Sequence, residues 1–216
     1  MYNGVKMFSS WKEGRVDLAS EGVNILTRFK QQNAAFLAEH KPVIENCYKW
    51  TQREESIAGT SFVDLIDFGI RRSKYSCDVV GALFKEIKLQ TAKNNWKVLC
   101  LVGAVNSAWE KPGFLIDRKP VYADNISLIH HLKKLLKRDW QGAQFVVSTC
   151  TRGKVDIKQR TSHLPKYLLG EEGFEHMDPF IPISVPNYNE KEAPSPVNYY
   201  IDKKWILREK GSFGRN

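Results

Sequence analysis

The sequence predicts an α/β fold in which a mainly parallel sheet is flanked by helices. Two stretches are typical of strands that are buried on both faces: an almost unbroken apolar run over residues 97–105, and residues 143–151, which are apolar at first and carry hydroxyl groups at their end. Amphipathic helical patterns alternate with these runs, and strands that alternate with helices favour parallel pairing. The 216 residues, of which 42% are hydrophobic and 26% charged, are enough for a globular core. We therefore predict one domain over residues 1–216.

The part of the chain before the first apolar run is predicted to be mostly helical. Apolar residues recur three and four positions apart in three stretches, which gives each predicted helix one apolar side. Ser76 is a plausible N-cap of the third helix. Residues 45–51 are a weaker strand candidate, because most of them are polar. The three helical stretches are residues 17–40, 62–70 and 79–87.

The rest of the chain continues the alternation. A helix over residues 124–140 separates the two apolar runs, and a short helix is predicted over residues 164–174. Residues 179–188 are predicted to be extended or an edge strand, because their prolines cannot donate hydrogen bonds to a sheet. An interrupted helix follows over residues 189–206. The tail, residues 209–216, shows no pattern and is predicted to be unstructured.

A formal net charge of +9 favours a polyanionic partner, either a nucleic acid or an anionic membrane surface. The basic residues form three separated clusters, and this arrangement favours contact with an RNA backbone. The alternative for the helical cluster is a solvated helix face. The clusters are Lys133, Lys134, Lys137 and Arg138 on one side of the 124–140 helix, Arg152, Lys154, Lys158 and Arg160 on a loop, and Arg71, Arg72 and Lys74.

The sequence contains no motif that supports catalysis. Neither the phosphate-binding pattern GxxxxGK[ST] nor the dinucleotide pattern GxGxxG occurs. No cysteine or histidine pair has the spacing of a metal site, and no apolar stretch is long enough to span a bilayer. Polar residues follow the two predicted strands, where they more often cap a turn than act on a ligand. We therefore predict that the chain is not an enzyme and has no catalytic or metal-binding residues.

One block is far more specific than these patterns. The stretch "LPKYLLGEEGFEHMDPFIPISVPNYNEKE" (residues 164–192) strongly resembles the closing block of the death-associated-protein-three family, the GTP-binding protein of the mitochondrial ribosome's small subunit. The stretches "VVGALFKEIKLQ", "NSAW" and "LIHHLKKLLKRDWQGAQFVVS" resemble the family in the same order. The likeness covers residues 17 to about 210.

The resemblance implies a partial P-loop NTPase core of the AAA-like type, located in the mitochondrion. It implies mitochondrial ribosomal RNA and mitochondrial ribosomal proteins as partners, without membrane insertion. GTP and Mg²⁺ are expected in full-length family members. This chain lacks the family's phosphate-binding loop, and Gly103 stands where the family has the acid that organises Mg²⁺. The strand-end residues, which would be the vestige of a nucleotide site, are Gly103, Asn106, Ser148 and Thr149.

Three functions remain open at this point, one of which, a protein-interaction module in apoptosis, is not favoured by anything in the sequence over a ribosomal role. The first is a structural component of the small ribosomal subunit, with no GTP hydrolysis by this chain alone, because the phosphate cradle and the metal-binding acid supply most of the catalysis in phosphoryl transfer. The second is a GTP-binding switch linked to apoptosis signalling that is active only in a full-length product. The missing strands would also expose the apolar edge of the 97–105 strand, so we expect a fragment, or a form that folds within an assembly.

Overall fold

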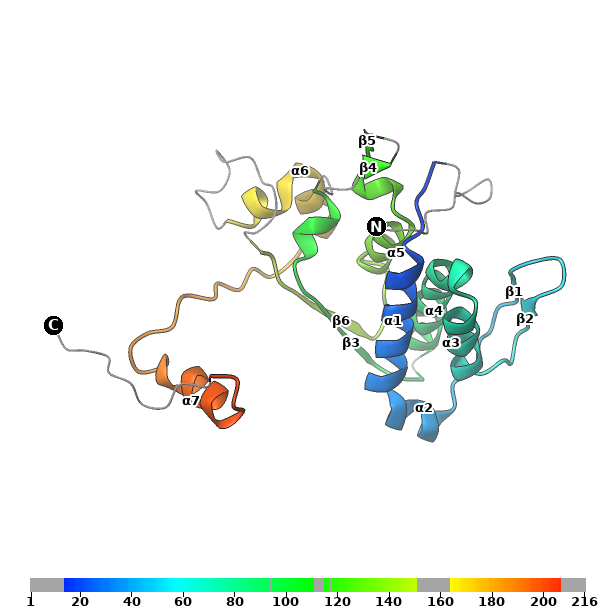
Figure 1. Cartoon of the computed structure of the whole chain (residues 1–216), viewed down its shortest axis with the longest axis horizontal. Helices are drawn as coiled ribbons and strands as arrows, with labels where there is room; N and C mark the ends of the chain where they lie inside the picture. Colours follow the sequence, from blue (N-terminus) through cyan, green and yellow to red (C-terminus); the bar gives the residue numbers. More distant parts are fainter. Residues whose placement is uncertain (1–13, 94, 111–114, 117, 151–163, 207–216) are drawn as a thin grey trace. The chain divides into compact units, whose positions relative to one another are not determined.

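The computed structural model describes residues 14–93, 95–110, 115–116, 118–150 and 164–206 (Figure 1). These residues belong to two compact units, which divide after Pro179 and are described separately. The helices of the first unit are α1 (Ala19–Gln32), α2 (Ala34–His40), α3 (Phe62–Arg71), α4 (Ser76–Ala92), α5 (Ser127–Leu135) and α6 (Pro165–Met177), with short 3-10 helices η2 (Ser73–Tyr75), η3 (Val105–Ala108) and η4 (Ala123–Asn125). Its strands are β1 (Tyr48–Lys49), β2 (Glu55–Ser56), β3 (Val98–Val102), β4 (Leu115–Ile116), β5 (Lys119–Pro120) and β6 (Ala143–Val147).

The main core lies where α1, α3 and α4 pack together (Figure 1). The helical stripes over residues 62–70 and 79–87 are confirmed, because most of their apolar residues are buried in this core. Burial of such side chains is the main favourable term in folding, at about 25 cal/mol per Å² of apolar surface. The core residues with almost no exposed surface are Leu26, Ile44, Phe62, Leu65, Ile66, Val79, Val80 and Leu83.

Two details of the helical region differ from the prediction. The expected single helix over residues 17–40 is two helices, because the side chain of Asn33 donates a hydrogen bond to the Phe29 carbonyl (2.8 Å) and α1 ends there. Ser76 is the first residue of α4 and not its N-cap. Its hydroxyl donates to the Ala19 carbonyl (2.8 Å), so it links the start of α4 to the start of α1.

Gly69 allows α3 to approach α1 and α4 closely, which makes Gly69→Ala a test of this packing. A Cβ at this position would lie 2.5 Å from Leu26 Cδ1 and 2.8 Å from Val79 Cγ1. We expect Gly69→Ala to lower the free energy of unfolding by about 1–3 kcal/mol, because overpacking outweighs the gain of about 1 kcal/mol in helix propensity. Urea denaturation measures this change. A gain in stability would show that the core accommodates the methyl group.

The sheet is small and is flanked by helices, which gives a mixed α/β fold. Strands β3 and β6 pair in parallel over five residues, from Val98 opposite Ala143 to Val102 opposite Val147. The other described pairs, β1 with β2 and β4 with β5, are antiparallel ribbons of two residues per strand.

The prediction that both apolar runs are buried on two faces is wrong. On one face of the β3–β6 pair, Leu99 is 62% exposed, Leu101 is 71% exposed and Val146 is 49% exposed. The alternate residues face the helices, with Val98 packed against the main core and Phe145 against Trp140. Successive strand residues point to opposite faces, so a pair of strands that helices cover on one side buries only every second residue.

The second unit contains α7 (Pro194–Asp202). Trp205 folds back on this helix, stacked on Tyr200 with ring centroids 5.5 Å apart. The segment before α7 is extended, as predicted, and forms no strand within the described residues, so Ile181, Ile183 and Val185 are largely exposed. The predicted tail, residues 209–216, lies outside the described part of the chain. None of the described helices has both the length and the apolar character needed to cross a membrane.

Candidate nucleic-acid interface

The basic cluster predicted on the 124–140 helix is divided by the end of that helix. Helix α5 ends at Leu135, and the indole Nε1 of Trp140 donates a hydrogen bond to the Leu135 carbonyl (2.7 Å). Lys133 and Lys134 therefore lie in the last turn of α5, where cations interact favourably with the helix dipole. Lys137 and Arg138 lie in the turn that follows. The expected four-residue strip on one helix face does not form.

Lys133 is engaged within the protein. Its side chain is only 12% exposed, and its ammonium group pairs with Asp124 (2.5 Å) and Glu172 (3.0 Å). The same ammonium group lies 5.4 Å from the centroid of the Trp109 ring, and His176 Nε2 is 2.9 Å from the Lys133 carbonyl oxygen. These contacts join α5 to η4, α6 and the end of η3, so Lys133 holds elements of the first unit together.

The contacts of α6 also show how part of the 164–192 block is used in the fold. Glu172 and Gly173 belong to the "LLGEEGF" stretch of α6. A Cβ at Gly173 would lie 2.9 Å from a ring carbon of Trp109, so only glycine allows this close approach. The block thus docks α6 against the residue that ends the "NSAW" stretch.

Lys134 and Lys137 line a groove of about 790 Å³ that neighbours α4, α5 and β1. Lysines from all three elements reach this groove, together with two aspartates. Aromatic side chains form much of the remaining wall. The lysines are Lys49, Lys74, Lys85, Lys88, Lys134 and Lys137; the aspartates are Asp78 and Asp139; the aromatic residues are Tyr48, Trp50, Tyr75, Phe84 and Trp140.

The groove carries an excess of positive charge. Lys88 pairs with Asp139, and its hydrogen bond is the main reason why the pKa of that carboxyl lies below its usual value. The other five lysines of the groove are exposed and form no ion pair with any acid that the structure describes. Next to Lys134, the pKa of His130 is lowered, first by burial and then by the positive charges of Arg15 and Lys134.

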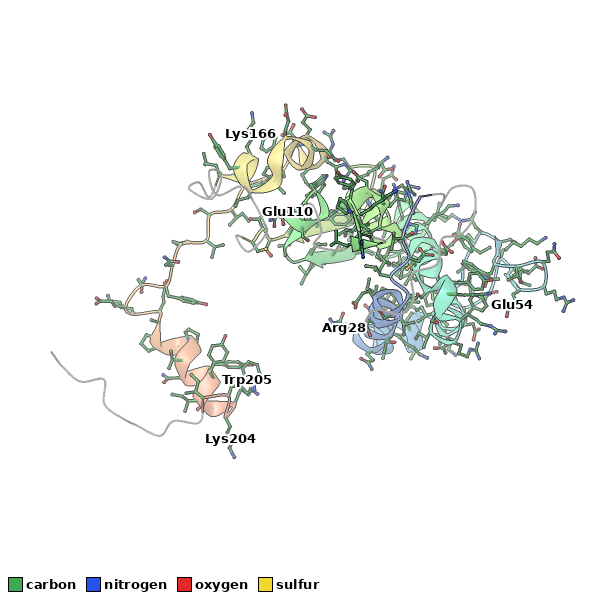
Figure 2. All side chains as sticks on the ribbon, turned by 45° about the horizontal axis from the view of Figure 1, so that its top comes forward. Arg28, Glu54, Glu110, Lys166, Lys204 and Trp205 are labelled. Carbon is green, nitrogen blue, oxygen red and sulfur yellow. The ribbon has the colours of Figure 1, made fainter. Side chains whose placement is uncertain are left out.

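Sequence reasoning missed half of the groove's lysines. Lys49, Lys85 and Lys88 stand apart from the basic clusters in the chain and meet Lys134 only through tertiary packing. The signal available in the sequence was the spacing of Lys85 and Lys88 on α4, which places both on the same side of the helix. Two other arginines from the predicted basic clusters do not join the groove. Arg138 is exposed but does not line it. Arg72 pairs with Glu54 (2.6 Å), a residue that lies between β1 and β2 (Figure 2). Arg152, Lys154, Lys158 and Arg160 lie outside the described residues.

The strand-end residues do come together in space. The Ser148 amide donates to the Val102 carbonyl (2.9 Å), and the Val105 amide donates to the Ser148 carbonyl (2.9 Å), so the two chain segments stay paired beyond the strands. Thr149 follows directly and is half-buried. A Cβ at Gly103 would meet only Ser148 Oγ, at 3.9 Å, so the site has room for a side chain at the position where the sequence has none.

The side chain of Asn106 makes three hydrogen bonds within the protein. Its Oδ1 accepts a hydrogen bond from the Cys150 amide (2.9 Å), and its Nδ2 donates to the Cys150 carbonyl (2.9 Å) and to Glu110 Oε1 (2.7 Å). The buried amide therefore bridges η3 and the chain after β6, and both of its N–H donors are used within the protein.

None of Gly103, Asn106, Ser148 and Thr149 carries a carboxylate, so these four residues by themselves are a poor fit for Mg²⁺. Magnesium in proteins is usually held by one or two carboxylates, and the acid in this cluster, Glu110, accepts the hydrogen bond from Asn106. In the part of the chain that the structure describes, no three histidine, cysteine or acidic side chains form a possible metal-binding group.

Comparison with known proteins identifies a family. The family model described as "Mitochondrial ribosomal death-associated protein 3" matches residues 3–215. The small ribosomal subunit protein mS29 of Mus musculus is 36% identical over 205 residues, which cover 94% of this chain and 52% of the mouse protein. The mS29 protein of Bos taurus is 35% identical over 203 residues, which cover 94% of this chain and 50% of the bovine protein. The chain thus spans about half the length of these relatives.

Proposed function

Because the chain belongs to the mitochondrial ribosomal death-associated protein 3 family, we propose that it is a structural component of the small subunit of the mitochondrial ribosome. Its partners in this proposal are mitochondrial ribosomal RNA and neighbouring ribosomal proteins. The observation that supports RNA contact is the groove, in which five exposed lysines from distant parts of the chain converge. Lysine contacts to phosphates position a protein on RNA without reading its sequence.

The proposal includes a fold assignment and the absence of GTP hydrolysis by this chain alone. The parallel β3–β6 pair, with α5 between the two strands in the chain, supports a partial P-loop NTPase core of the AAA-like type. The commitment of Asn106 to the scaffold and the glycine at position 103 argue against catalysis at these strand ends. GTP and Mg²⁺ are expected in longer family members, and equilibrium dialysis of this chain with GTP and Mg²⁺ tests the expectation that it does not bind them.

Charge reversal in the groove tests ribosomal association. We expect Lys134→Glu combined with Lys137→Glu to weaken association with the small subunit, because two phosphate-facing charges become repulsive. The measurement is a sucrose gradient of mitochondrial lysate at several salt concentrations, from cells in which the variant replaces the natural protein. The variant is expected to leave the small-subunit peak at a lower salt concentration than the wild type.

The control changes the same amount of charge outside the groove. Lys119→Glu combined with Lys166→Glu alters two exposed lysines that do not line it, and Lys166 projects from α6 (Figure 2). This control is expected to sediment as the wild type does. If the groove variant and the control have the same salt dependence, the groove does not contact the ribosome.

A further inference from the structure

We propose that the groove is a site for single-stranded RNA, in which lysines hold phosphates and aromatic rings stack on unpaired bases. This inference rests on the proposed function, since both require the groove to contact RNA, but it adds which form of RNA binds and by which groups. Proteins that bind single strands without sequence preference combine a basic groove with aromatic stacking platforms.

The structure places cations and rings together at three points of the groove. Lys74 Nζ lies 4.5 Å from the centroid of the Tyr75 ring. Lys85 Nζ is 5.8 Å from the Tyr48 ring, and Lys88 Nζ is 5.8 Å from the Trp140 ring. Such pairs are cation–π contacts in the protein alone. Long lysine side chains are able to turn toward a phosphate while the ring face takes the neighbouring base.

The rings are held in place, and three of them have no polar atom left for reading a base. The Tyr48 hydroxyl donates to Glu86 Oε1 (2.6 Å), and Trp50 Nε1 donates to Ser56 Oγ (2.9 Å). Trp140 Nε1 donates to the Leu135 carbonyl (2.7 Å). Recognition of a base sequence requires hydrogen bonds to base edges. Tyr48 and Trp50 stack on each other, and Trp50 also stacks on Phe68, with ring centroids 5.7 and 5.4 Å apart. Trp140 is therefore the ring proposed to stack on a base, and binding is expected to tolerate any sequence.

The same features favour a single strand over two alternatives. In an RNA duplex the bases stack on one another, so their faces are not available to Trp140 or Tyr75. An acidic protein segment would satisfy the lysines but would leave the aromatic walls without a stacking partner. Single-stranded RNA supplies both the phosphates and the π faces.

Fluorescence anisotropy with the 216-residue chain tests the inference. The probes are an unstructured 12-nucleotide RNA of mixed sequence, a scrambled version of it and a 12-base-pair RNA duplex. We expect the two single strands to bind equally, and roughly tenfold more tightly than the duplex. Lys134→Glu with Lys137→Glu is expected to weaken single-strand binding and to reduce its salt dependence, whereas Lys119→Glu with Lys166→Glu leaves both unchanged.

A matched pair of substitutions at Trp140 tests stacking. Both Trp140→Phe and Trp140→Leu remove the hydrogen bond to Leu135, so their effects on folding are similar, but only the phenylalanine retains a ring. We expect Trp140→Leu to weaken single-strand binding roughly tenfold relative to Trp140→Phe. Equal affinities of these two variants, or of single strand and duplex, would overturn the single-strand site and leave the ribosomal proposal standing. If polyglutamate bound to the chain and neither the single-stranded nor the duplex RNA did, both the single-strand site and the proposed RNA contact of the groove would be rejected.

Discussion

Replacing Glu86 with alanine is expected to lower the free energy of unfolding by about 3–5 kcal/mol, which is the usual cost of removing one partner from a buried charged network. Glu86 is fully buried in α4, and it accepts four hydrogen bonds from the segment that leads into β1. The donors are the Glu45 amide (2.7 Å), the Asn46 amide (3.2 Å), Asn46 Nδ2 (2.8 Å) and the Tyr48 hydroxyl (2.6 Å).

The network also keeps the Tyr48 hydroxyl protonated. Burial, followed by the hydrogen bond to Glu86 and its charge, raises the pKa of Tyr48 well above its ordinary value. The hydrogen bond from the Tyr48 hydroxyl to Glu86 is therefore expected to persist into alkaline pH, and it holds the segment that carries Lys49 and Trp50 against α4. The loss in Glu86→Ala comes from partly buried donors that no longer have an acceptor and from the cavity left in α4.

Two further variants make the Glu86 prediction specific. Glu86→Gln retains an acceptor at the Oε1 position, which serves three of the four donors. It places an NH₂ group against the Glu45 amide, where the native protein has an acceptor. We therefore expect a loss of unfolding free energy between those of the other two variants. Glu171→Ala removes an exposed carboxylate on α6 and is expected to change stability by less than about 0.5 kcal/mol. Urea denaturation ranks the three. If Glu86→Ala and Glu171→Ala have equal effects, the network does not stabilise the fold.

Replacing Asn106 with leucine is expected to lower the free energy of unfolding by about 2–5 kcal/mol. Leucine has nearly the same shape but leaves the amide and the carbonyl of Cys150 without the partners that they have in the native protein. A buried backbone group that loses its hydrogen bond costs about 1–3 kcal/mol. Thermal or urea unfolding, followed by circular dichroism, measures the loss.

The neighbouring serine supplies the control for Asn106. Ser107 is exposed, and its hydroxyl donates to the Ala104 carbonyl (2.7 Å), so Ser107→Ala is expected to cost less than about 1 kcal/mol. A wild-type stability for Asn106→Leu would mean that this amide does not support the scaffold. That result would instead favour the hypothesis that Asn106 is the remnant of a nucleotide site, together with Gly103, Ser148 and Thr149.

Local patterns predicted much of the fold. The stripes that became α3 and α4 depend on residues three and four positions apart, and a helix brings such residues to one side whatever else the chain does. The break at Asn33 was missed because it depends on one side chain that bonds to the backbone four residues earlier. The exposed face with Leu99 and Leu101 was missed because an apolar run does not show how many layers cover a strand.

The sequence by itself determined the class of fold, the surplus of positive charge and, through the 164–192 block, the family. The tertiary structure alone decided which lysines face solvent. Lys133 and Lys134 are neighbours on α5, yet one is enclosed by Asp124 and Glu172 and the other lines the groove with lysines from β1 and α4. The physical reason is that charge interactions depend on distance and burial, and packing between remote segments sets both.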